Sequence, residues 1–139
     1  MNKFFSVCLS VMILTMSTVA RADVITNDTY FTVRQKLREM APNDFKARKI
    51  CERIEGERVH FTSRVISVRK SGSISADMDG SEIFSIPDIN LSLFDTDEAE
   101  NVRIGQEIEY TGVVTSCRYN TGFGSLFFEV GGGRLIKHY

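Results

Sequence analysis

The chain has 139 residues, a formal net charge of −1 and three cysteines. Proteins that bind nucleic acid usually carry a strongly basic face, so this near-neutral composition argues against a nucleic-acid partner. Hydrophobic residues make up 42 % of the chain, which is enough for one buried core.

The first 22 residues are predicted to be a secretory signal peptide. Lys3 supplies a cationic start, the run from Phe4 to Ala20 is almost purely apolar or small, and Ala20-Arg21-Ala22 is a small-x-small cleavage signature. The alternative is a membrane anchor, but polar residues interrupt the run, which is short for a span of roughly 20 apolar residues. We therefore expect a periplasmic or secreted bacterial protein that has no stable membrane insertion once the leader is removed.

The mature chain would keep 117 residues (139 less the 22 of the leader), with 15 basic and 18 acidic residues and a net charge of −3. Residues 23–56 are predicted to form two helices packed on the rest of the domain. Asn27 or Thr29 can cap the first helix, which Pro42 follows, and Asn43 can cap the second, which Gly56 ends.

Residues 57–139 are predicted to form a small β-barrel, because two of their segments echo each other. GERVHFTSRV begins at Gly56 and GQEIEYTGVV begins at Gly105, and both alternate with the period of a strand behind a Gly turn. We expect the two segments to pair antiparallel. The predicted strands are 58–69, 73–79, 88–94, 106–119 and 125–130, with a short helix at 96–100 and a bend at the triple Gly before a closing Leu135-Ile136.

Cys51 and Cys117 are predicted to form a disulfide. If the two echo segments pair antiparallel, the start of the first lies near the end of the second, and this brings Cys51 close to Cys117. Export makes such a bridge chemically possible. The alternative is two unpaired thiols, one in a helix and one in a strand.

Five strands with a short helix between the third and fourth follow the order of an OB-fold, a Greek-key barrel. The runs GERVHFTSRVISV, ISADMDGSEIFSIPDINLSLF and AENVRIGQEIEYTGVV resemble exported bacterial OB-fold proteins of the tRNA anticodon-binding-like domain group. The resemblance implies the fold over roughly 44–136, and its motifs are structural Gly and apolar positions. One departure is Ser63, which stands where the group usually has Gly.

No arrangement typical of a catalytic or cofactor site is found in the sequence. The two histidines, His60 and His138, lack the neighbours that a metal site needs, and His60 is expected to lie on the surface of a strand. The segment from Asp77 to Glu82 resembles the start of a calcium loop, but its flanking pattern is β, and a hairpin turn is the simpler interpretation. We therefore predict no metal, no cofactor and no enzymatic activity.

OB-folds generally bind ligands between the loop that joins strands one and two and the loop that joins strands four and five. These loops contain Arg69 and Lys70 on one side, and Arg118, Tyr119 and Phe123 on the other. Cations beside aromatic rings suit a polyanion, a sugar or a protein hot spot. The alternative is that the aromatic rings only cover the mouth of the barrel.

The favoured function is a non-enzymatic binding module for a protein partner or an envelope glycan. A second hypothesis is an inhibitor or immunity-type protein, because residues 71–110 carry ten acidic residues against one basic residue and could mimic a polyanion. The third hypothesis is single-stranded nucleic-acid binding, which the fold alone permits.

Overall fold

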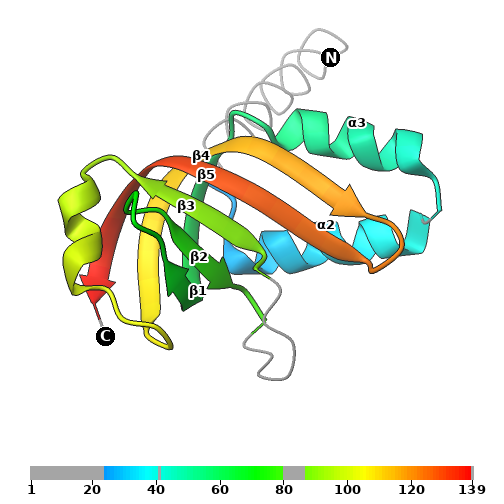
Figure 1. Ribbon diagram of the computed structural model, residues 1–139. Coiled ribbons are helices and arrows are strands. Elements are labelled where there is room, and N and C mark those ends of the chain that lie inside the picture. The colour runs from blue at the N-terminus through cyan, green and yellow to red at the C-terminus, as the bar shows by residue number, and fades with distance from the viewer. Residues whose placement is uncertain (1–23, 41, 80–86, 139) are drawn as a thin grey trace, which may run out of the picture.

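Figure 1 shows the computed structural model, which describes residues 24–40, 42–79 and 87–138. The predicted signal peptide lies outside the described residues. None of the helices in these ranges has the length and apolar character needed to cross a membrane.

Two helices precede the barrel at the predicted positions. The α2 helix spans Asn27–Met40 and the α3 helix spans Asp44–Ile54. The Asn43 side chain caps α3, because its oxygen accepts a hydrogen bond from the Lys46 N–H at 3.1 Å.

Five strands close into one barrel in the order β1-β2-β3-β5-β4. Of the five pairings between these strands, that of β3 with β5 is parallel and the other four are antiparallel. The predicted fold class, a mainly β OB-fold-like barrel with helices at the N-terminus, is confirmed. The strands are β1 Arg58–Val68, β2 Ile74–Asp77, β3 Ile89–Leu93, β4 Glu107–Asn120 and β5 Ser125–His138, and the 3-10 helix η1 Thr96–Asn101 lies between β3 and β4.

The two echo segments form the neighbouring strands β1 and β4, as predicted. Phe61 lies opposite Tyr110 in the antiparallel ladder, and their ring centroids are 6.1 Å apart. Both side chains are fully buried. The repeated aromatic position therefore places two rings face to edge inside the barrel, where such pairs add to the stabilisation from burial.

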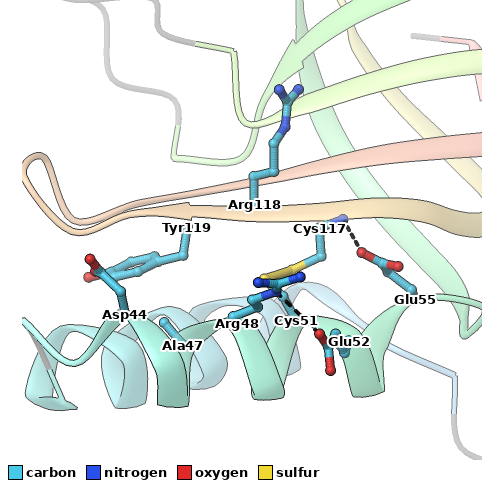
Figure 2. Close-up of a pocket in the computed structure, with 9 residues that line it drawn as sticks. All are labelled: Asp44, Ala47, Arg48, Cys51, Glu52, Glu55, Cys117, Arg118 and Tyr119. Carbon is cyan, nitrogen blue, oxygen red and sulfur yellow. Dashed lines mark hydrogen bonds and ion pairs between the residues drawn. A yellow bond between two sulfur atoms is a disulfide. The ribbon is translucent and has the colours of Figure 1, made fainter.

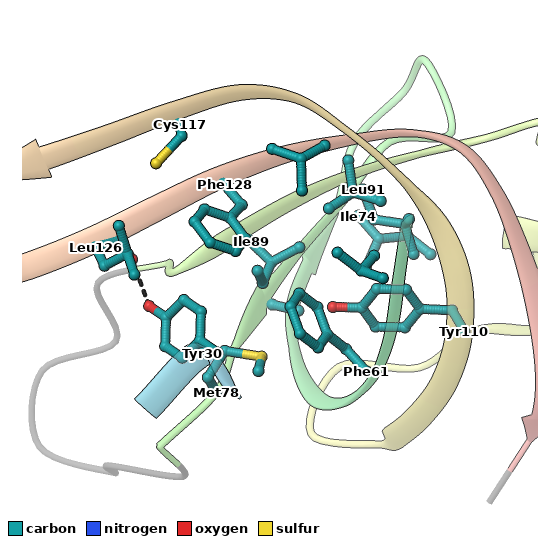
Figure 3. Packing of buried hydrophobic residues seen from close by; sticks show 14 of the residues in the cluster. Tyr30, Phe61, Ile74, Met78, Ile89, Leu91, Tyr110, Cys117, Leu126 and Phe128 are labelled. Carbon is teal, nitrogen blue, oxygen red and sulfur yellow. Dashed lines mark hydrogen bonds between the residues drawn. The ribbon is translucent and has the colours of Figure 1, made fainter. Parts of the chain in front are cut away.

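Tyr30 of α2 plugs one end of the barrel. Its ring is fully buried and meets the rings of Phe61 and Phe128 edge-on, at 6.0 and 5.3 Å. Its hydroxyl donates a hydrogen bond to the Leu126 carbonyl (Figure 3). Burial raises the pKa of Tyr30, so the hydroxyl remains a donor in this position.

The prediction that the fifth strand ends at Val130 is wrong, because β5 continues through the triple Gly to His138. The Gly residues keep the strand close to its neighbours. A Cβ at Gly133 would lie 2.5 Å from Leu91 Cδ1, and a Cβ at the facing Gly112 would lie 2.4 Å from Val130 Cγ1. A side chain at either position would therefore force the strands apart, so the glycines permit a continuous strand.

Ser63 is buried inside the barrel. Its hydroxyl lies 2.8 Å from the Tyr110 hydroxyl and donates to the Met78 sulfur at 3.0 Å. The irregularity in the pairing of β1 with β2 falls later, between Val65 and Ser67. A serine is thus accommodated at this position by polar contacts within the core.

The α3 helix lies along β4 beyond the point where β1 stops pairing with it. The predicted disulfide between Cys51 and Cys117 joins the two elements, with a Cα–Cα distance of 5.1 Å. Close by, the Gly56 N–H donates to the Val114 carbonyl at 2.7 Å, and a Glu55 carboxylate oxygen accepts from the Cys117 N–H at 3.4 Å. The helix therefore covers a length of β4 that would otherwise be an open sheet edge.

The segment before α2 extends the sheet beside β1. Ile25 forms a parallel bridge with Val59, with backbone hydrogen bonds of 2.9 Å to Arg58 and His60. The Asn27 side chain then donates to the Thr62 carbonyl at 2.8 Å and accepts from the Thr62 N–H at 2.9 Å. One amide thus substitutes for a residue of a neighbouring strand, and it fixes the start of α2 on the barrel.

Replacing Cys51 and Cys117 together by Ser should lower the free energy of unfolding by about 4 kcal/mol, because a 66-residue loop is no longer closed in the unfolded chain. Urea unfolding of the oxidised protein and of the double variant measures the difference. Equal unfolding midpoints would show that the bridge does not stabilise the fold.

Replacing Asn27 by Ala should lower the free energy of unfolding by about 1–3 kcal/mol, because a part-buried Thr62 N–H and C=O lose their partner. Thr32→Ala is the matched control on the same helix, since the Thr32 hydroxyl makes one exposed bond, to the Asp28 carbonyl. Its effect should stay within about 0.5 kcal/mol. Similar losses in both variants would contradict the role given to Asn27.

Candidate functional site

Two hollows open beside the hairpin formed by β4 and β5. The first, of about 550 Å³, lies between α3 and β4, and the second, of about 530 Å³, runs along the hairpin. Asp44, Arg118 and Tyr119 line both. Figure 2 shows the residues that line the first. The remaining lining of the first is Ala47, Arg48, Cys51, Glu52, Glu55 and Cys117, and that of the second is Pro87, Asn120, Thr121, Ser125, Leu126 and Phe127.

Tyr119 and Arg118 extend to opposite sides of the hairpin, because successive strand residues alternate. Figure 2 shows Cys117 and Tyr119 pointing toward α3 and Arg118 pointing away from it. The Tyr119 hydroxyl is buried there, and it has no hydrogen-bond partner among the residues that the structure describes. The Arg118 guanidinium stacks over the Phe127 ring at 4.9 Å and lies 3.6 Å from a Glu129 carboxylate oxygen.

Charges of both signs surround the first hollow. Arg48 and Glu52 are 3.3 Å apart, with side chains 80 % and 50 % exposed, and Asp44 is also exposed. An ion pair this open to water contributes little to stability. These side chains are therefore available to hydrogen-bond a ligand, together with the exposed guanidinium of Arg118 on the other side of the hairpin.

The structure brings together only part of the predicted site. Arg118 and Tyr119 line both hollows, whereas Phe123 lies at the hairpin tip with 79 % of its surface exposed. Arg69 and Lys70 lie in the turn between β1 and β2, which packs against η1, since a Cβ at Gly72 would lie 3.0 Å from Thr96 Cβ. In Figure 1 the η1 helix and the β4–β5 hairpin are at opposite ends of the molecule.

This separation has a simple cause. Because β1 and β4 are antiparallel, the end of β4 lies beside the start of β1, away from the β1–β2 turn, and the 14-residue β4 carries the β4–β5 hairpin further along the helices. Arg69 and Lys70 therefore belong to another surface.

His60 lies on the surface of β1, as predicted. Its Nε2 is 2.6 Å from a Glu109 carboxylate oxygen on β4, and 44 % of its side chain is exposed. The pair links two neighbouring strands of the barrel.

A cluster of three carboxyl groups, which the sequence analysis did not predict, lies where β2 ends and β3 begins. Oxygen atoms of Asp77, Asp79 and Asp88 all lie within 4.8 Å of one another, and Asp77 and Asp88 are only 6 % and 7 % exposed. Arg34 of α2 pairs with Asp79 at 2.7 Å. The Met78 N–H donates to Asp88 at 2.9 Å, and the Asp79 N–H donates to Asp77 at 3.0 Å.

Two buried carboxylates so close together repel each other unless one of them holds a proton. Burial, followed by a hydrogen bond with the Asp77 carboxyl, raises the pKa of Asp88 to about 8. At neutral pH the Asp88 carboxyl therefore holds a proton. Carboxylates are also the ligands that hard cations prefer, and among the described residues this is the one group of acids, histidines or cysteines close enough together to hold a metal ion.

The chain matches no family model, no curated protein and no solved structure in the comparisons made. Its resemblance to the tRNA anticodon-binding-like group therefore remains a prediction.

The contribution of Asp88 to the free energy of unfolding should fall as the pH rises from about 4 to about 8, by up to about 1.4 kcal/mol per pH unit. The reason is that the folded protein keeps a proton on Asp88, which the unfolded chain releases near its ordinary pKa of 3.8. Above the folded pKa this contribution is lost and stability should level off. Urea unfolding at several pH values measures the slope.

Asp88→Asn should flatten that slope, because an amide oxygen can still accept from Met78 but does not titrate. Glu100→Gln, an exposed change on η1, is the control and should leave the slope unchanged. An Asp88→Asn protein with the same pH dependence as the wild type would show that this carboxyl does not carry the proton.

Proposed function

We propose that the protein is an exported, non-enzymatic binding module that recognises a protein partner or an envelope glycan beside the β4–β5 hairpin. The observation that carries this proposal is the meeting of the two hollows at Asp44, Arg118 and Tyr119. Each hollow has the volume of a typical ligand pocket. Tyr and Arg are the residue types that most often dominate binding energy at protein surfaces.

The Cys51–Cys117 bridge supports the export that this proposal requires, because structural disulfides persist mainly in oxidising compartments. It also holds α3 against β4 on one side of the first hollow. A preformed wall lowers the entropy that a ligand must give up on binding.

The second candidate function, an inhibitor or immunity-type protein, is favoured by the surface around η1. Asp95, Asp97 and Glu100 are exposed there, and 72 % of the neighbouring Phe94 is exposed. The β1–β2 turn, with Arg69 and Lys70, packs against the same helix and adds positive charge. Because these two cations lie beside the acidic residues, the surface around η1 resembles a polyanion less than the acidic run of residues 71–110 alone would indicate.

The binding proposal is tested with the immobilised protein and envelope extract. Arg118→Glu should lower recovery of the partner about tenfold or more, as expected for a binding hot spot. The double variant Arg69→Glu/Lys70→Glu is the matched control, because it reverses charge at the other end of the molecule, and it should retain the partner.

Treatment of the extract with protease before capture shows whether the partner is a protein or a glycan. Equal recovery by the wild type and Arg118→Glu would reject the hairpin as the binding surface. Loss of recovery only in the Arg69→Glu/Lys70→Glu variant would move the site to the η1 end, whereas a gain in recovery would favour the second candidate function, because the surface around η1 becomes more acidic.

A further inference from the structure

The last turn of α2, the first turns of α3 and the tip of the β4–β5 hairpin converge at one end of the molecule (Figure 1). The Arg38 Nε–H of α2 donates to the Gly124 carbonyl of the hairpin at 2.9 Å. Asp44 of α3 and Thr121 of the hairpin line the same hollow. We define the helical end as residues 36–40, 44–49 and 120–125.

Two aromatic rings at the helical end are open to water. Phe123, at the hairpin tip, is 79 % exposed, and Phe45, at the start of α3, is 69 % exposed. Met40, at the end of α2, is 38 % exposed. Large apolar side chains gathered on a surface mark a site of interaction with a partner or a membrane.

The cations of the helical end are also exposed. The segment has five basic and two acidic residues, and all seven are exposed: Lys36, Arg38, Glu39, Asp44, Lys46, Arg48 and Lys49. One turn further along α3, Glu52 pairs with Arg48 and Lys49 at 3.3 and 3.9 Å. Lys49 also lies over the Phe45 ring, 5.5 Å from its centroid, so a cation and an exposed ring occupy the same surface.

The opposite end of the molecule has exposed apolar side chains but a different charge. Phe94 and Ile104 are 72 % and 74 % exposed. Acidic residues of and beside η1 follow Phe94 in the chain, and Arg69 and Lys70 lie in the adjacent β1–β2 turn. Arg134 stacks over the Phe94 ring at 4.8 Å, so charges of both signs are mixed there. The combination of exposed rings with an excess of positive charge is therefore a property of the helical end.

We propose that the helical end docks reversibly on an anionic lipid membrane. Phe45 and Phe123 enter the boundary between lipid headgroups and acyl chains, while the neighbouring lysines and arginines meet lipid phosphates. The two rings lie on a hairpin tip and at the start of a helix, which are protruding parts of the molecule. Protruding rings can enter the flat surface of a bilayer, whereas an extended acidic peptide would need a groove to lie in. The helical end adjoins the two hollows, because Asp44 lines both of them, but Phe45, Phe123, Lys46 and Lys49 line neither.

The test is a sedimentation assay with the full chain and vesicles of phosphatidylcholine, with or without phosphatidylglycerol. The wild type should bind the anionic vesicles about tenfold more tightly than the neutral ones, and added salt should reduce the difference. The leader, if it is retained, carries Lys3 and Arg21 and would itself favour anionic vesicles, so the decisive comparison is between variants that share the same leader.

Phe45→Ser/Phe123→Ser should bind both kinds of vesicle more weakly, because the rings that enter the acyl boundary are lost, whereas Phe94→Ser/Ile104→Ser should bind as the wild type does. The charge reversal Lys46→Glu/Lys49→Glu changes two exposed positions. It should weaken the binding to anionic vesicles and leave the binding to neutral vesicles unchanged, because only the attraction to lipid phosphates is lost. Circular dichroism checks that each variant is folded.

Equal binding to both kinds of vesicle by the wild type would overturn the proposal, as would equal losses in the two double Ser variants. Soluble polyglutamate provides the competing outcome. If it binds more tightly than anionic vesicles, and in a manner that depends on Phe45 and Phe123, the helical end recognises acidic polypeptides and the membrane proposal is wrong.

Discussion

The pairing of β1 with β4 is the constraint on which the rest of the structure depends. It closes the barrel, brings Phe61 against Tyr110 in the core, and ends at a point that leaves the second half of β4 free to extend with β5. The α3 helix then covers that free length, and the disulfide fixes it in place. Both hollows and the exposed hairpin tip follow from this one arrangement.

The barrel and its disulfide could be predicted because they leave local and repeated signals in the sequence. The echo segments have strand alternation, and their antiparallel pairing alone places Cys51 beside Cys117. The cap of α3 is equally local, since Asn43 and Lys46 are three residues apart. The length of β5 was missed because Gly normally weakens a strand, and here close approach to Leu91 requires it.

The site was harder to predict because its parts meet only in three dimensions. General OB-fold geometry placed Arg69 and Lys70 with Arg118, but the antiparallel pairing of β1 with β4 puts the β4–β5 hairpin at the opposite end of the barrel from the β1–β2 turn. The carboxyl cluster joins Asp88 to two acids about ten residues earlier and to Arg34 on a helix. The sequence shows only a group of acids around Asp77. The protonation of Asp88 depends on its burial, and no local sequence pattern indicates that this residue is buried.

The covalent link between Cys51 and Cys117 also has a consequence for the order of events during folding. The two thiols are separated by 66 positions, with β1, β2 and β3 between them. They approach each other only when the chain after β3 has returned to the first strand. Native pairing of these two thiols therefore depends on the meeting of β1 with β4, and formation of the bridge reports that the two strands have met.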